Sequence, residues 1–246
     1  MPLSTLDRRT LLKALALAPA TAVVLPQSAL AEAEAAGLIV PEVCLVQPEL
    51  TEGPFYVDPG LIRGDIAEGR PGLPLVLRLQ VVTADCRPVE GARVDVWHCD
   101  AEGVYSGVSN LGEGPDTSGQ TFLRGTQMTG ADGVAEFRTI YPGWYPGRTT
   151  HIHYKVFLAD GTALTSQVFF DEAMTAAIYD DHAAYEERAA GRDMFNAQDR
   201  IAREAGAGAI ARVDLPEPDG EAVAALVVGI AEGGQGGLLD RLFGRG

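Results

Sequence analysis

The alternation of apolar and polar positions predicts a chain that folds mainly into β-strands. Successive side chains of a strand point to opposite faces of a sheet, so strict alternation marks a strand with one buried face. The segment 73–83 shows this pattern most clearly. Its apolar face is formed by Leu75, Leu77, Leu79 and Val81, and its mixed face by Val76, Arg78 and Gln80.

Further segments of the same kind recur along the chain, with turn signals such as Asp132-Gly133 and Asp160-Gly161 between them. Short strands separated by Gly, Pro and Asp turns are typical of sandwiches. The sequence therefore predicts an all-β fold, an antiparallel β-sandwich core with long loops and short helices. The expected strands are 92–99, 133–140, 149–158, 163–169 and 222–230, and the segments of helical or loop character are 172–187 and 193–204.

The first 31 residues have the pattern of an export signal. Arg8 and Arg9 precede a mildly apolar, Ala-rich run, and Ala29-Leu30-Ala31 resembles a small-x-small cleavage site. We expect a twin-arginine-like signal over 1–31 with cleavage after Ala31, which predicts a secreted or periplasmic protein. An ordinary secretory signal or an amphipathic tail is the alternative. The expected organisation continues with a linker over 32–47, one domain over 48–232 and a flexible tail over 233–246.

Charge and cysteine content narrow the possible partners. The formal net charge of −15 disfavours binding to nucleic acid or to anionic membrane surfaces. The apolar run near the N-terminus is too short for a membrane span, so no stable membrane anchoring is expected. Cys44, Cys86 and Cys99 allow one disulfide and one free thiol in an oxidising compartment, and the sequence leaves all three pairings open.

A candidate metal site follows from two histidines and two tyrosines. His151 and His153 are two residues apart on a predicted strand, so both imidazoles lie on one face. Tyr145 lies six residues upstream in a Pro/Gly-rich loop, and Tyr105 follows a turn after an apolar strand. Phenolate is a hard anionic donor that deprotonates beside a strong Lewis acid. Two phenolates and two neutral imidazoles suit a trivalent ion better than zinc, which favours Cys, His or carboxylate.

Short sequence blocks surround these residues in a fixed order over roughly residues 44–230. They are Thr51-Glu52-Gly53-Pro54-Phe55-Tyr56, Arg63-Gly64-Asp65-Ile66, Val94-Asp95-Val96-Trp97-His98-Cys99-Asp100-Ala101, Gly103-Val104-Tyr105-Ser106, Arg124-Gly125, Thr139-Ile140-Tyr141-Pro142-Gly143-Trp144-Tyr145 and Gly147-Arg148-Thr149-Thr150-His151-Ile152-His153. In this order the blocks resemble the intradiol ring-cleavage dioxygenases, the family of protocatechuate 3,4-dioxygenase and the catechol 1,2-dioxygenases.

The resemblance implies a non-haem iron(III) enzyme that uses O2 to cleave a small-molecule catechol between its two hydroxylated carbons. It implies that Tyr105 and His151 are equatorial ligands of Fe(3+), and that Tyr145 and His153 are axial ligands. In similar enzymes the axial tyrosine takes up a substrate proton. Arg148 matches an arginine that stabilises negative charge on the substrate, and Gln167 matches a nearby glutamine that supports it.

Some features remain open or depart from the family pattern. The spacing from Tyr145 to His151 is shorter than in protocatechuate 3,4-dioxygenase, so the loop over the metal is expected to be tighter. The helical N-terminal dimerisation region of catechol 1,2-dioxygenases is missing, so monomer and homodimer both remain possible. The sequence pattern does not identify which catechol is the substrate. Residues 51–56, 63–72 and 107–125 are expected to line the substrate pocket. His98 is expected to be structural.

Two other function classes compete with the dioxygenase. One is a non-catalytic β-sandwich module that binds carbohydrate or aromatic ligands, against which the presence of all four metal positions and Arg148 argues. The other is a zinc or copper hydrolase built on the two histidines, which lacks an obvious carboxylate ligand on their strand.

Overall fold

The computed structural model of the chain describes residues 45–58, 60–109, 115–159, 161, 163–215 and 220–231. The predicted export signal and the predicted tail over 233–246 lie outside these residues, as does most of the predicted linker. Within the linker range, Val46 forms a bridge with Gly229 and Gln47 is buried, so the domain already includes these two residues. None of the helices in the described ranges is long and apolar enough to cross a membrane.

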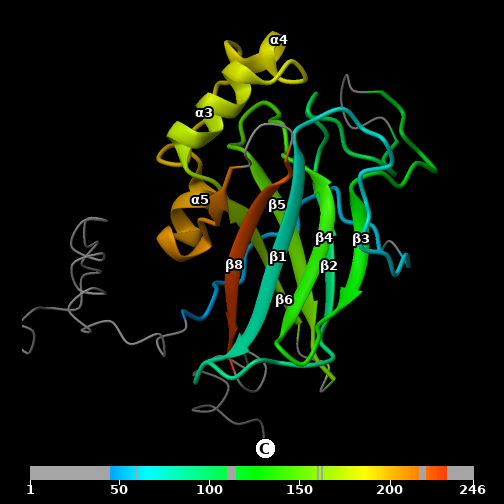
Figure 1. The fold of residues 1–246 in the computed structure, drawn as a ribbon, viewed down its shortest axis with the longest axis vertical. Helices are drawn as coiled ribbons and strands as arrows, with labels where there is room; N and C mark the ends of the chain where they lie inside the picture. The colour runs from blue at the N-terminus through cyan, green and yellow to red at the C-terminus, as the bar shows by residue number, and fades with distance from the viewer. Residues whose placement is uncertain are drawn as a thin grey trace, which may run out of the picture. The chain divides into compact units, whose positions relative to one another are not determined.

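Two four-stranded sheets form the core of the domain, which confirms the predicted all-β sandwich (Figure 1). The first sheet has the order β4 (Val134–Ile140), β1 (Pro74–Thr83), β8 (Ala222–Ile230) and β7 (Arg212–Asp214). The second has the order β3 (Arg124–Met128), β2 (Arg93–Trp97), β5 (His151–Phe157) and β6 (Ala163–Phe169).

The second sheet is antiparallel throughout, whereas the first contains one pair that the sequence reading did not anticipate. Strands β1 and β8 run parallel, with Leu75 opposite Ala222 and Thr83 opposite Ile230. Figure 1 shows the two strands side by side. The prediction of an antiparallel sandwich therefore needs this correction. Alternation along a strand reports which face is buried, but it carries no information about the direction of the neighbouring strand.

The short helices come after β6, as predicted. Asp171 is the N-cap of helix α3 (Glu172–Asp181), and Asp199 is the N-cap of helix α5 (Arg200–Ala205). Each aspartate side chain accepts at least one hydrogen bond from a backbone N–H of the first turn. The one-turn helix α4 (Glu186–Ala189) lies between them, and the 3-10 helix η1 (Ala207–Ala209) follows α5.

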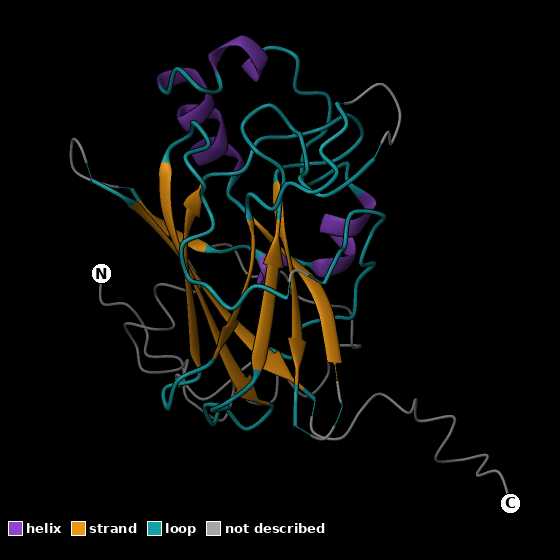
Figure 2. Ribbon diagram, turned by 90° about the vertical axis from the view of Figure 1, so that its right-hand side faces the viewer, coloured by secondary structure: helices purple, strands orange, loops and turns teal. Residues whose placement is uncertain are grey.

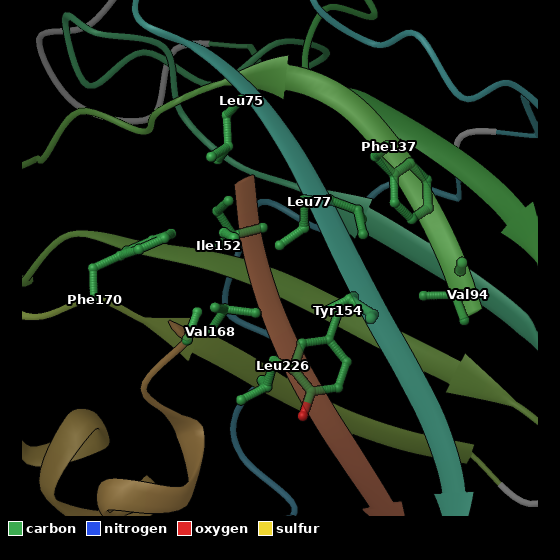
Figure 3. Close-up of a cluster of buried hydrophobic side chains, with 14 of the residues drawn as sticks. Leu75, Leu77, Val94, Phe137, Ile152, Tyr154, Val168, Phe170 and Leu226 are labelled. Atoms are coloured by element: carbon green, nitrogen blue, oxygen red, sulfur yellow. The ribbon is translucent and has the colours of Figure 1, made fainter. Parts of the chain in front are cut away.

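Apolar side chains from both sheets meet between the layers and form the main core (Figure 3). Leu77 of β1 and Phe137 of β4 face Ile152 and Tyr154 of β5, and all four are fully buried. The alternation predicted for β1 is present, because Leu75, Leu77, Leu79 and Val81 are buried while Arg78 is exposed. Each such buried aliphatic side chain contributes about 1.5–3 kcal/mol to the hydrophobic stabilisation of the fold.

Several loops and the helices α3 and α4 lie at one end of the strands, whereas α5 lies beside them (Figure 1 and Figure 2). The strand register identifies that end. Trp97, the last residue of β2, is opposite both Arg124 at the start of β3 and His153 of β5, and His151 is opposite Phe169 at the end of β6. The loop that follows β4 starts at the same end, because Thr139 near the end of β4 bonds to His98 just after β2, and Gly143 N–H donates to the carbonyl of Asp100 at 3.1 Å. Both loops that carry candidate tyrosines therefore leave the sandwich at this end.

Candidate metal centre

His151 and His153 are the first and third residues of β5, and their imidazoles point to the same side of the second sheet. Their Nε2 atoms are 3.1 Å apart, and both side chains are buried. The Nδ1–H of His151 donates a hydrogen bond to the carbonyl oxygen of Thr149 at 2.6 Å. This bond fixes the tautomer of His151, and its Nε2 lone pair is directed to the site.

The two predicted tyrosines reach the same point from separate loops. The Oη of Tyr105 is 3.5 Å from Nε2 of His151, and the Oη of Tyr145 is 3.4 Å from it. The structure thus brings together all four residues that the sequence proposed as metal ligands. Tyr105 is 3% exposed, whereas Tyr145 is partly exposed, so the site opens on the side of Tyr145.

The spacing of the donor atoms fits a common metal ion. With metal–nitrogen bonds of about 2.0–2.1 Å, neighbouring ligands at angles between 90° and 109° are about 2.9–3.4 Å apart. The distances of 3.1–3.5 Å around His151 Nε2 agree closely with this range. Among the described residues, no three His, Cys, Asp or Glu side chains form a metal-binding group, so a metal at this site needs the phenol oxygens.

Burial sets the protonation of the four donors when no cation is present. It lowers the pKa of His151 to about 3 and that of His153 well below its ordinary value, and the positive charge of Arg148 acts in the same direction. Burial also raises the pKa of Tyr145 to about 12 and raises that of Tyr105 well above its ordinary value. The imidazoles are therefore neutral and ready to coordinate, whereas the phenols ionise only beside a strong positive charge.

An aromatic shell surrounds the donors. The ring of Trp97 stacks on His153 with centroids 4.9 Å apart, and the ring of Phe55 stacks on Tyr105 at 4.3 Å. Phe55 also meets the ring of Tyr145 edge-on at 5.7 Å. Phe55 belongs to the 51–56 segment that the sequence placed at the pocket. These rings exclude water from the donors, which strengthens electrostatic interactions in the site.

Arg148 lies at the partly exposed side of the site. One terminal nitrogen, Nη1, is 3.4 Å from Tyr145 Oη and 3.4 Å from His151 Nε2. The other, Nη2, donates to Gln167 Oε1 at 2.6 Å, and Gln167 Nε2 donates to the backbone carbonyl of Thr51 at 3.3 Å. Arg148 and Gln167, the two residues that the resemblance singled out beside the metal, thus contact each other. Arg148 also contacts the donors, and Gln167 is opposite His153 in the β5–β6 pair.

Asp199 is a residue of the site that the sequence reading missed. Its carboxylate is paired with Arg148 at 2.8 Å and its side chain is 2% exposed. Burial alone would raise the pKa of Asp199, but hydrogen bonds from Arg148 and from the backbone of Thr149 outweigh it and hold the pKa below its ordinary value. In the sequence, Asp199 shows only the pattern of a helix N-cap, and no motif associates it with Arg148.

The remaining candidates lie away from the donors. His98 is buried, with Nδ1 bonded to the carbonyl oxygen of Cys99 and Nε2 bonded to the hydroxyl of Thr139, so it is structural as expected. Cys86 is disulfide-bonded and Cys99 is a buried free thiol, which excludes the pairings that involve Cys99. Cys44 lies outside the described residues.

Comparisons with known proteins find similar sequences and structures. A family model described as "Dioxygenase" matches residues 51–206. The solved structure of an intradiol ring-cleavage dioxygenase from Tetranychus urticae is 32% identical, covers 78% of this chain and 98% of its own, and gives a TM-score of 0.71. Catechol 1,2-dioxygenase 1 of Acinetobacter lwoffii is 33% identical over 159 residues, which is 55% of this chain and 49% of that protein. Hydroxyquinol 1,2-dioxygenase of a Rhizobium species is 32% identical over 138 residues, 48% of this chain and 45% of that protein. The chain spans about half the length of these curated relatives.

Proposed function

The chain belongs to the intradiol ring-cleavage dioxygenases, and on that premise we propose that it is a non-haem iron(III) enzyme that opens catechol-type rings. The bond between the two hydroxylated carbons breaks, and both atoms of O2 enter the product, which is a cis,cis-muconate-type dicarboxylate. The relatives are named for catechol and for hydroxyquinol, which supports an ortho-diphenol as the substrate class.

One observation carries the proposal. Two phenol oxygens and a second imidazole nitrogen lie within 3.5 Å of Nε2 of His151, in a buried aromatic shell. Tyr105, Tyr145, His151 and His153 would hold the ion. Iron(III) bound there supplies a Lewis acid that favours the ionised form of the phenols and of a chelating catechol.

The protein side chains then have separate tasks. Tyr145 is the partly exposed donor, so its Oη is the site that takes up a proton from the entering catechol hydroxyl. Arg148 directs Nη1 at this region and stabilises negative charge that develops on the ring and its oxygens. Gln167 holds the second terminal nitrogen of Arg148 and is itself tied to Thr51. The rings of Phe55 and Trp97 shield the four donor atoms from water.

Visible absorption and product analysis test this function together. Tyrosinate bound to iron(III) absorbs visible light, so the iron-loaded protein should be red-brown and should convert at least one ortho-diphenol to a ring-opened dicarboxylate. Catechol, protocatechuate, 4-methylcatechol and hydroxyquinol form a suitable panel. A colourless protein with full metal loading would contradict the assignment, and it would favour the binding module or the hydrolase.

We further propose that the enzyme is exported through a twin-arginine-like signal over residues 1–31. The paired Arg8 and Arg9 support this, and so does the disulfide at Cys86, because disulfides persist mainly in oxidising compartments. Replacing both arginines with lysine should retain the protein in the cytoplasm, while N-terminal sequencing of the wild-type secreted product should begin at Glu32. Normal export of the Arg8→Lys/Arg9→Lys variant would exclude the twin-arginine route.

A further inference from the structure

The carboxylate of Asp199 connects the start of helix α5 to the loop that carries Arg148. Its Oδ1 accepts hydrogen bonds from the backbone N–H groups of Ile201 at 2.7 Å and Ala202 at 3.3 Å. Its Oδ2 accepts from Arg148 Nε at 2.8 Å and from the backbone N–H of Thr149 at 3.0 Å. Each carboxylate oxygen thus receives two donors, and Asp199 is fully engaged.

These contacts fix the plane of the Arg148 guanidinium. Nε is bound by Asp199 and Nη2 by Gln167, so one edge of the planar group is held at both corners. The remaining corner, Nη1, lies 3.4 Å from both Tyr145 Oη and His151 Nε2. Rotation about the last bonds of the side chain would break at least one anchoring bond. Asp199 and Gln167 therefore determine where Nη1 points.

The same C-terminal segment holds the rest of the Arg148 loop. Arg192 Nη2 donates to the hydroxyl of Thr149 at 2.9 Å, and that hydroxyl donates to Asn196 Oδ1 at 2.8 Å. The carbonyl of Thr149 in turn accepts the Nδ1–H of His151 at 2.6 Å. On the other side of Arg148, the backbone N–H of Gly147 donates to the carboxylate of Asp193 at 3.3 Å, so segment 192–199 holds the loop both before and after Arg148.

We propose that Asp199 is a positioning residue of the reaction: it orients the Arg148 guanidinium so that Nη1 is in place before the substrate arrives. The inference rests on the proposed function, because the role of Arg148 does. A preorganised cation needs no rearrangement while charge develops, which is why orientation affects turnover more than substrate binding.

The substitution Asp199→Asn tests the inference. Asparagine is a good N-cap residue, so α5 can keep its cap through the amide oxygen. The amide NH2 group, however, replaces an oxygen that accepts from two N–H donors, so Arg148 loses its anchor. We expect kcat to fall about 10- to 100-fold. KM, iron content and the visible absorption band should change little, because the four donors remain.

Asp171→Asn provides the matched control. Asp171 is also a helix N-cap, and its Oδ1 accepts from the backbone N–H of Met174 at 3.0 Å. Among the described residues, the hydrogen-bond partners of Asp171 belong to α3 and include no arginine. If the two asparagine variants lose kcat equally, Asp199 acts only as a helix cap and the inference is overturned.

Combining Asp199→Asn with Arg148→Ala separates positioning from other effects. If Asp199 acts through Arg148, the double variant should be no slower than Arg148→Ala alone. If the losses in kcat of the two single variants multiply in the double variant, the inference is overturned. A thermal-unfolding cycle on the same variants is independent of activity, and here too the decreases in Tm should be less than additive. If the wild-type protein cleaves no catechol, the proposed function fails. The Tm measurements still test the inference in that case, because additive losses would refute the coupling of Asp199 to Arg148.

Discussion

His151 and His153 are held in place by different forces, although they are neighbours on one strand. His151 is oriented by its hydrogen bond to Thr149. The Nδ1 of His153 is buried and has no hydrogen-bond partner among the described residues, and the ring is held by stacking on Trp97 instead. Stacking fixes the plane of a ring but not its tautomer, and a cation bound at Nε2 would leave the single proton of neutral His153 on Nδ1.

Removing the imidazole of His151 should abolish metal binding. Its Nε2 is within 3.5 Å of each of the other three donor atoms, so His151→Ala removes the centre of the donor set. We expect less than about a tenth of the wild-type iron content, in line with the steep dependence of metal affinity on ligand number. Elemental analysis of the purified variant measures this. His98→Gln is the matched control, since His98 is a buried histidine outside the site, and iron-replete His151→Ala would refute the ligand assignment.

Tyr145→Phe should separate metal binding from turnover. Three donors remain, and the partly exposed position of Tyr145 indicates that its contribution to retention is the smallest. We expect the variant to keep much of its iron but to lose at least about 100-fold in kcat, because the proton acceptor for the substrate is gone. Iron content and turnover measured on the same sample decide the matter. Turnover close to wild type would remove Tyr145 from the proton transfer.

The sequence could identify the residues of the site that are neighbours along the chain, but it could not identify Asp199. Two histidines at positions i and i+2 of a strand share a face by geometry alone, and Tyr145 and Arg148 are within six residues of His151. Asp199 is 51 residues from Arg148, and they meet only through the packing of α5 beside the second sheet. A buried ion pair of this kind leaves no local pattern.

At the scale of elements, the turn after β2 sets the position of Tyr105. Asp100 Oδ1 accepts from the backbone N–H groups of Glu102 and Val104, and the N–H of Gly103 donates to the carbonyl of Asp100 at 3.0 Å. Gly103 has φ of +81°, and a Cβ at this position would collide with the carbonyl oxygen of Trp144. The turn and the Tyr145 loop are therefore in direct contact.

Gly103→Ala should destabilise the fold by about 3 kcal/mol or more, because backbone strain and steric overlap add. Gly91→Ala is the matched control: its φ is +74°, but a Cβ there meets nothing within 4 Å. That variant should lose only about 1–2 kcal/mol from the left-handed backbone. Denaturant unfolding measures both losses, and equal losses would show that the contact with Trp144 is unimportant.

Strand β3 was not predicted from the sequence, and its residue types explain why. Strand β3 reads Arg124-Gly125-Thr126-Gln127-Met128, and its polar residues are buried by hydrogen bonds rather than by apolar contacts. Hydrophobic alternation cannot detect such a strand. The strand expected over 163–169, in contrast, is present as β6 (Ala163–Phe169), and it pairs with β5.

At the scale of the whole molecule, His98 joins the two sheets. It follows β2 of the second sheet, and its Nε2 binds Thr139 of β4 in the first. Burial lowers the pKa of His98 to about 4, although its bond to the carbonyl of Cys99 opposes this. The protonated form therefore favours the unfolded chain, in which the pKa is near its ordinary value of about 6.5.

This linkage predicts a fall in stability on mild acidification. The contribution of neutral His98 is fully present above pH about 6.5 and is lost as the pH falls toward 4. Between pH 7 and pH 5, His98 alone should remove about 2 kcal/mol from the free energy of unfolding. Denaturation curves at both pH values should show a smaller decrease for His98→Gln than for wild type. An identical decrease in the two proteins would show that His98 does not titrate on unfolding.

The parallel pairing of β1 with β8 constrains the order in which the protein can mature on the ribosome. All four candidate ligands lie between residues 105 and 153, yet β8, which lies between β1 and β7 in the first sheet, begins only at Ala222. A nascent chain that already contains the complete donor set therefore still exposes the inner face of an unfinished sheet. Completing the first sheet pairs Leu75 with Ala222, which is distant from it along the sequence. Contacts between residues so far apart in sequence form late in folding. We therefore expect a stable metal site to form only after β8 has joined the first sheet.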